Sequence, residues 1–201
     1  MKFSNVLPAA VLAFAFLPGM MSTSSALPSG IENDASRAPR VVIVIRHGEK
    51  PPKKEHSPDL TAIGQERAKR IPGLFAGSAD RKAVIPHPDA LFATHASPGS
   101  NREIETLTPL ARALNLPLDD RFSEDQGGQL AAELLSGKYA GKVVVICWHH
   151  GQIPALVTSL GVAEAPKWAD TTFDRIWEVE WDQGNAVMKD LPENLMPGDS
   201  Q

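Results

Sequence analysis

Cysteine is almost absent from this chain. Cys147 is the only one among 201 residues, so the fold has no intrachain disulfide and depends on its hydrophobic core. Cys147 lies in the apolar run VVVICW, which favours a buried, inert thiol over a reactive nucleophile.

The chain also lacks an excess of basic charge. It has 20 Lys and Arg against 24 Asp and Glu, for a net charge of −4. Proteins that bind nucleic acid or anionic membranes without specificity need a strong positive balance, so we expect neither partner. Any anionic substrate must be bound by a local basic cluster. Composition leaves the oligomeric state open.

Long hydrophobic runs are missing except at the N-terminus. There, VLPAAVLAFAFLPGMM follows Lys2 and is interrupted by Pro18 and Gly19 before small residues that end at Ala26. A membrane span needs about 20 apolar residues, whereas this pattern is typical of a cleavable export signal. We expect residues 1–26 to be a signal peptide and the mature protein to be periplasmic or secreted, without stable membrane association. An uncleaved anchor and a buried N-terminal helix are the alternatives.

The rest of the chain has the length of one domain. Residues 27–39 are rich in Pro, Ser, Gly and charge and show no hydrophobic periodicity, which predicts a disordered leader. We expect the folded domain to span residues 40–192 and a flexible tail to follow at residues 193–201.

Strand and helix patterns alternate along this domain. Buried strands are expected at 41–45, 89–94 and 142–147, and two half-exposed strands at 175–181 and 185–191. Helices are expected at 59–71, 100–116, 127–137 and 153–161, the first capped by Thr61 and the second by the capping-box pair Ser100 and Glu103. Continuous apolar strands alternating with helices predict the α/β class, as a three-layer α/β/α sandwich with a mostly parallel central sheet.

Polar residues follow two of these buried strands. Arg46 and His47 come directly after the strand 41–45, and His149 and His150 come just past the strand 142–147. Ligands in such sheets bind beyond the carboxyl ends of the strands. If the two strands are neighbours, an arginine that matches phosphate oxygens meets imidazoles able to carry a phosphoryl group. The pattern therefore favours phosphoryl chemistry.

Four blocks in order, RHGE, LTAIGQERA, NREIETLTPLARAL and VVVICWHHGQ, resemble the histidine phosphatase superfamily, also called the phosphoglycerate mutase-like family. The resemblance covers about residues 41–161. It implies a phosphatase that acts on a small phosphorylated substrate, a phosphomonoester or phosphohistidine, through a phosphohistidine intermediate. It implies no metal and no cofactor.

The resemblance also implies roles for single residues. His47 matches the nucleophile, Arg46 and Arg102 match the phosphate-binding arginines, and His150 matches the second histidine, which stabilises the transferring group. Glu124 is the candidate general acid, a role that needs a pKa raised by burial. The alternatives are that Glu124 is a solvated loop charge, or that the substrate is phosphohistidine and no acid is required.

Other polar residues have two interpretations. If its strand continues, His149 points to the opposite face from His150 and packs under the site or supports it. His95 is either an exposed loop residue or reaches the pocket. Lys50, Lys53 and Lys54 lie either at the pocket rim or in a solvated loop, and His56 and His87 are expected to be exposed. Glu105 is expected to be structural rather than catalytic. Trp168 and Trp177 are expected to be packing residues rather than substrate platforms.

Three other functions compete with the phosphatase. A mutase of the same family would return the phosphate to its substrate, but the span from Arg102 to His150 leaves little room for the insertions seen in mutases. A metal-dependent hydrolase would use His47, His149 and His150, although neither motif has nearby carboxylates in metal-ligand spacing. A non-catalytic member of the fold that binds a phosphorylated ligand is the third.

Overall fold

The computed structural model describes Met1, residues 35–76 and residues 85–200. The expected signal peptide, apart from Met1, and residues 27–34 of the expected leader lie outside the described residues. The elements described below belong to one compact unit, Ile31–Gln201. Among the described residues, no helix has the length and apolar character needed to cross a membrane.

A sheet of six strands forms the centre of the described part, in the order β3-β2-β4-β1-β5-β6. The strands are β1 Val41–Arg46, β2 Ala90–Ala93, β3 Leu118–Asp119, β4 Val143–Trp148, β5 Arg175–Asp182 and β6 Asn185–Pro192. The first four are parallel to one another, β5 pairs antiparallel with β1, and β6 pairs antiparallel with β5. The predicted α/β class with a mostly parallel sheet is confirmed, as are the two C-terminal strands.

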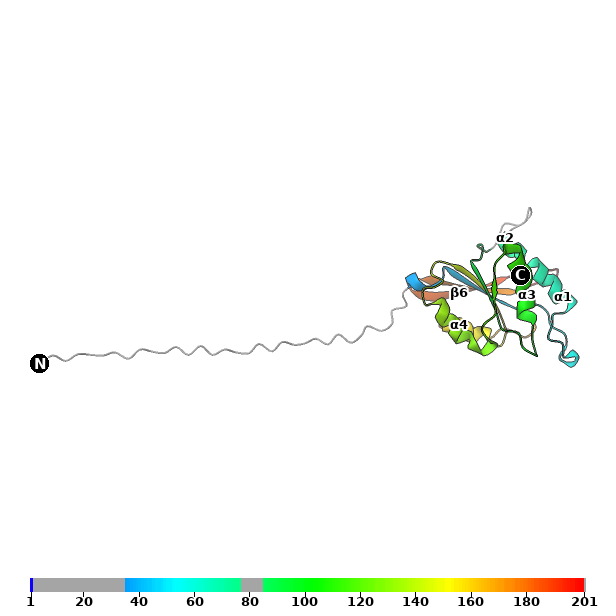
Figure 1. Cartoon of the computed structure of the whole chain (residues 1–201), viewed down its shortest axis with the longest axis horizontal. Helices are drawn as coiled ribbons and strands as arrows, with labels where there is room; N and C mark the ends of the chain where they lie inside the picture. The colour runs from blue at the N-terminus through cyan, green and yellow to red at the C-terminus, as the bar shows by residue number, and fades with distance from the viewer. Residues whose placement is uncertain (2–34, 77–84, 201) are drawn as a thin grey trace. The chain divides into compact units, whose positions relative to one another are not determined.

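Helices cover both faces of this sheet. They are α1 Ala62–Arg70, α2 Pro72–Ala76, α3 Arg102–Leu114, α4 Gly127–Leu134 and α5 Ile153–Ser159, with short 3₁₀ turns η1 Ala35–Arg37, η2 Lys53–Glu55 and η3 Glu124–Gln126. Val42 and Val44 of β1 pack in one core cluster with α4 and α5, whereas Ile43 and Ile45 pack in the other with α2 and α3. Figure 1 shows α4 on one side of the sheet and α1 and α3 on the other. The predicted three layers are therefore present.

Local sequence explains where α1 begins and how it is anchored. Thr61 is its N-cap, as predicted, and accepts a hydrogen bond from the backbone N–H of Gly64 at 3.1 Å. Glu105 of α3 accepts hydrogen bonds from Leu60 N at 2.8 Å and from Gln65 Nε2 at 3.1 Å. Glu105 therefore joins α3 to the start of α1, in the structural role that the sequence predicts.

Two segments expected to lack structure are instead held in place where they are described. The backbone N–H of Gly141 donates to Ala38 O at 3.1 Å, within the expected leader. In the expected tail, Glu193 and Asp199 form ion pairs with Arg67 of α1 at 3.0 and 2.8 Å. The reason lies in Arg67, a buried arginine that needs carboxylate partners. Charges that look solvated in the sequence of the tail supply them.

The register of the sheet positions the candidate site. β1 and β4 are parallel neighbours, and Arg46 pairs with Trp148 at their carboxyl ends. The residues that follow, 47–48 and 149–150, therefore leave the sheet side by side at the same edge.

Candidate active site

Four residues named from the sequence meet at this edge. The His47 ring lies 6.4 Å from the ring of His150, measured between centroids. The charges of Arg46 and Arg102 both act on His47, and Arg46 also acts on His150. All four residues are buried. The structure thus brings Arg46, His47, Arg102 and His150 together, while their chemical roles stay predictions.

His47 is held as a neutral imidazole. Its Nδ1 lies 2.7 Å from Gly48 O, which assigns a proton to Nδ1 and leaves Nε2 with a lone pair. Burial, together with the charges of Arg46 and Arg102, lowers the pKa of His47 from 6.5 to about 2, against the opposing effect of the Gly48 hydrogen bond. Nε2 is buried and has no hydrogen-bond partner in the described part of the chain. It is therefore suited to act as a nucleophile.

Two glycines allow α1 to pack against the loop that carries His47. A Cβ atom on Gly64 would lie 2.6 Å from the backbone oxygen of Glu49, and one on Gly48 would lie 3.0 Å from Gly64 O. The Gly64 distance is shorter than a side chain tolerates, and the Gly48 distance would force the neighbouring backbone to shift. The close backbone contact therefore requires glycine at Gly64 and favours it at Gly48.

Arg46 is positioned by a loop that the sequence patterns did not single out. Its Nη1 donates to Ala169 O at 3.2 Å and to the carbonyls of Asp170 and Thr172 at 2.8 Å each. Its guanidinium lies 3.8 Å from the centre of the Phe173 ring. Burial lowers the pKa of Arg46 to about 10, so the group stays charged at neutral pH. Its Nε and Nη2 are buried without a hydrogen-bond partner among the residues that the structure describes.

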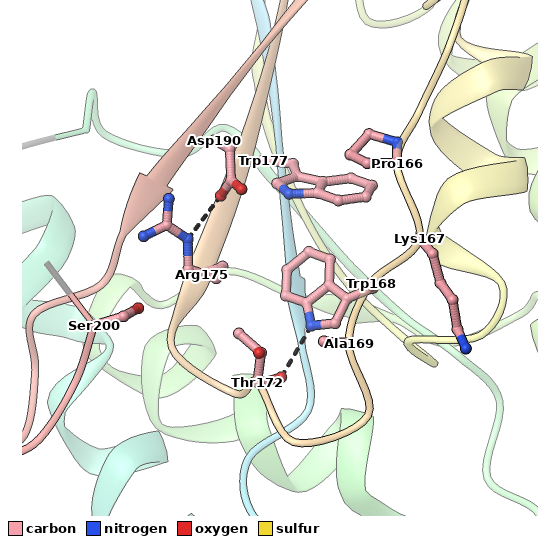
Figure 2. A pocket seen from close by; sticks show the side chains of 9 residues that line it. All are labelled: Pro166, Lys167, Trp168, Ala169, Thr172, Arg175, Trp177, Asp190 and Ser200. Carbon is pink, nitrogen blue, oxygen red and sulfur yellow. Dashed lines mark hydrogen bonds and ion pairs between the residues drawn. The ribbon is translucent and has the colours of Figure 1, made fainter.

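The same loop is anchored from its other side. Trp168 Nε1 donates to Thr172 O at 2.9 Å, so the Thr172 carbonyl accepts from both Trp168 and Arg46. The Trp168 ring packs against Trp177 of β5 with centroids 4.8 Å apart, and Figure 2 shows the two rings side by side. Both tryptophans are buried, which supports the predicted packing role, and both also line a cavity of about 330 Å³.

Arg102 is the first residue of α3. Its Nη1 donates to Ser57 O at 3.0 Å and its Nη2 to Gly99 O at 2.9 Å. Its Nε is buried with no hydrogen-bond partner in the described residues. The start of a helix also favours an anion. Thr106 Oγ1 donates to Arg102 O at 2.7 Å and accepts from Gly48 N at 3.0 Å, so α3 is linked directly to the loop of His47.

His149 and His150 lie on the same side of the sheet edge. Opposite faces were expected only if the strand continued, and β4 instead ends at Trp148, after which the chain turns. The two rings are 4.5 Å apart, and the His149 ring lies 6.2 Å from His47.

The two ring nitrogens of His150 have different surroundings. Its Nε2 lies 3.3 Å from Asp170 Oδ1, and its Nδ1 has no hydrogen-bond partner within residues 35–76 and 85–200. Burial, followed by the charge of Arg46, lowers the pKa of His150 to about 4. His150 is therefore neutral near pH 7.

Glu124 does not have the buried environment expected of a general acid. Its side chain is 57% exposed, and its Oε2 lies 3.7 Å from His149 Nδ1. The backbone is held by Trp148, whose Nε1 donates to Glu124 O at 3.1 Å. η3 sits at the rim, so water reaches the carboxylate. Glu124 therefore borders the site at its solvent-exposed rim.

A buried carboxylate next to Arg102 was missed. Glu103 is 2% exposed, and its charge acts on Arg46 and His149. It lines a cavity of about 150 Å³ that it shares with Glu124. In the sequence Glu103 belongs to a capping-box pattern with Ser100. The structure instead has Ser100 Oγ donating to the Glu103 carboxylate at 2.6 Å, and Asn101 is the N-cap.

The loop after His47 forms a cationic side of the site. Lys50, His56 and Arg102 line a cavity of about 540 Å³ together with prolines and Ser57. The charge of Lys50 acts on His149 and His150, which places this lysine at the pocket rim. His95 is 63% exposed and also lines the smaller cavity with Glu103 and Glu124.

Neither a metal centre nor a reactive thiol is found at this edge. Within the described ranges, no group of three or more His, Cys, Asp and Glu side chains is arranged to hold a metal ion. Cys147 is buried, and burial raises its pKa well above 9, as expected for an inert thiol.

Comparisons with known proteins give structural likeness alone. No family model and no curated protein matches the chain. Among solved structures, phosphoglycerate mutase from Bacillus anthracis aligns at 15% identity and a TM-score of 0.48, over 75% of this chain and 92% of its own. Phosphoserine phosphatase from Entamoeba histolytica aligns at 16% and 0.47, over 74% and 94%. A mycobacterial glucosyl-3-phosphoglycerate phosphatase aligns at 11% and 0.44, over 77% and 98%. Values this low say nothing about activity, which has to be argued from the site.

Proposed function

We propose that this protein is a metal-independent phosphatase that hydrolyses phosphomonoesters, or phosphohistidine, through a phosphohistidine intermediate on His47. The observation that carries the proposal is a set of buried nitrogens without partners in the described residues. They are Nε and Nη2 of Arg46, Nε2 of His47, Nε of Arg102 and Nδ1 of His150. Leaving buried polar atoms unpaired is costly. A tetrahedral phosphate would accept from the arginine nitrogens and face the lone pair of His47, and a phosphate hydroxyl would donate to Nδ1 of neutral His150.

The arrangement supports a two-step reaction. Nε2 of neutral His47 attacks phosphorus, and the bond from phosphorus to the ester oxygen breaks as the phosphoryl group passes to His47. Arg46 and Arg102 neutralise charge on the phosphoryl oxygens, where preorganised cations contribute most. Water then attacks phosphorus, inorganic phosphate leaves, and His47 returns to its neutral state.

The test uses an aryl phosphate and the variant His47→Gln, with His87→Gln as control. His87 is exposed and precedes β2, at the end of the sheet away from the site. We expect His47→Gln to lower kcat by at least about 10³-fold, His87→Gln to leave it unchanged, and EDTA to have no effect. Brief incubation with labelled substrate should leave acid-labile, base-stable label on His47. Chelator sensitivity, or full activity in His47→Gln, would overturn the proposal.

The same experiment separates the alternatives. A mutase would form the labelled intermediate but return the phosphoryl group to an acceptor, so little inorganic phosphate would appear. A non-catalytic phospholigand-binding protein would bind phosphate without forming the label.

We also propose that the protein is exported, on the strength of residues 1–26. An N-terminus at Leu27 in protein recovered from the periplasm or medium of producing cells would support export, and an intact Met1 in the cytoplasm would contradict it.

A further inference from the structure

His149 has no part in the reaction just proposed, yet it lies as close to the nucleophile as His150 does. Its ring is 6.2 Å from that of His47, against 6.4 Å for His150. The His149 side chain is 29% exposed, so it lies between the buried phosphoryl site and solvent.

The contacts of His149 occupy one ring nitrogen and leave the other. The N–H of Gly151 donates to Nδ1 at 3.3 Å while the ring is neutral, and Glu124 Oε2, 3.7 Å from the same atom, is the acceptor for Nδ1 once the ring is protonated. With Nδ1 turned toward the protein, Nε2 is the nitrogen left for a substrate.

Charges of both signs face the His149 ring. Glu124 from η3 and Glu103 from α3 favour its protonated form. Burial, which has the largest effect, lowers its pKa, as do Lys50 of the following loop and Arg46 of β1. His47 and His150 are neutral neighbours. A phosphate dianion bound beside the ring adds negative charge and shifts this balance toward the imidazolium.

We propose that His149 is the proton donor to the leaving oxygen and that Glu124 is the residue that positions it. This inference rests on the proposed phosphatase function. It also explains the exposed Glu124: a carboxylate needs no burial to orient an imidazolium, whereas it does need burial to hold a proton itself at neutral pH.

The proton balance of this assignment closes. His149 starts as an imidazolium. As His47 Nε2 bonds to phosphorus and the ester bond breaks, the Nε2 proton of His149 passes to the ester oxygen and a neutral alcohol leaves. Neutral His149 then takes a proton from the water that attacks the phosphohistidine. Inorganic phosphate departs, and both histidines regain their starting states.

The experiment compares 4-nitrophenyl phosphate, whose leaving group needs no proton, with an alkyl phosphate, whose leaving group does. We expect His149→Gln to lower kcat about 100-fold or more on the alkyl phosphate and less than about 5-fold on the aryl one. His87→Gln is the control for both. Glu124→Gln should show a smaller loss in the same direction, and the double variant should lose no more than His149→Gln. Equal losses on both substrates would overturn the assignment, as would a leaving-group effect in Glu124→Gln alone.

A second measurement does not need turnover. NMR titration of the histidine resonances with inorganic phosphate should raise the pKa of His149 in the wild type and raise it less in Glu124→Gln. A pKa of His149 unmoved by phosphate would refute the proposal. Failure of the phosphatase function itself shows differently, as full activity in His47→Gln or absence of the phosphohistidine label.

Discussion

Replacing Arg67 by methionine removes the positive charge that three carboxylates share. Glu49 lies 2.8 Å from its guanidinium, Glu193 3.0 Å and Asp199 2.8 Å. The Arg67 side chain is 6% exposed, and Glu193 is fully buried. Methionine fills a similar volume and carries no charge, so the substitution isolates the electrostatic part of this cluster.

The size of the effect follows from what is left behind. Removing one partner of a buried ion pair costs about 3–5 kcal/mol, because an uncompensated charge remains in the interior. Here burial raises the pKa of Glu193 to about 8, in spite of Arg67, so Glu193 already holds a proton at pH 7 and the charges left unpaired are those of Glu49 and Asp199. A domain of this size loses about 2–4 °C of Tm per kcal/mol, which predicts a fall of about 6–20 °C.

Urea unfolding and thermal melting at pH 7 measure the change, with Arg70→Met as the matched control. Arg70 lies on the same helix and pairs with Glu66 at 3.0 Å, but both side chains are 44% exposed. Exposed pairs contribute at most about 1 kcal/mol. Arg70 also donates to Leu195 O of the tail at 3.0 Å, so the comparison tests the effect of burial. Equal losses of stability in Arg67→Met and Arg70→Met would refute the reasoning.

Three other substitutions test the site and its supports. The raised pKa of Glu193 means that the native state keeps a proton that the unfolded state has lost. Wild-type stability should therefore fall as pH rises from about 4.5 to about 8. Urea unfolding across this range should show a smaller fall in Glu193→Gln. Gly64→Ala should cost about 1–3 kcal/mol of stability and lower kcat, because its Cβ would meet Glu49 O at 2.6 Å. A Cβ on Gly73 meets nothing within 4 Å, so Gly73→Ala should change neither stability nor kcat in the same assays. Arg102→Lys should lower kcat/KM about 100-fold, because an ammonium cannot bond Ser57 O and Gly99 O and a phosphate together; a loss below 5-fold would contradict the role.

Much of the fold follows from short-range patterns. The apolar runs before Arg46 and before His149 become adjacent parallel strands, because a run of buried β-branched residues is compatible with few other environments. The position of both histidine motifs at one sheet edge then follows from topology. This is why Arg46, His47 and the two histidines after β4 could be named in advance, whereas Arg102 was named from the resemblance.

What escaped prediction depends on contacts across long stretches of chain. Arg46 is oriented by backbone carbonyls near residue 170, and carbonyls carry no sequence signal. The exposure of Glu124 depends on where η3 meets the rim of the site. The orientation of His149 depends on the residue at which β4 ends, and strand ends are the least certain part of any sequence pattern. The partners of Arg67 come from both ends of the domain.

The carbonyl oxygen of Thr172 accepts two hydrogen bonds and so links a side chain of the packed interior to an arginine of the candidate site. Trp168, from the packed interior, donates to the same oxygen atom that accepts from Arg46. Removing the indole N–H would leave the Arg46 cation in place but loosen its support. If Arg46 binds phosphate as proposed, selection can change how tightly phosphate is held through this aromatic side chain, with Arg46 itself unchanged.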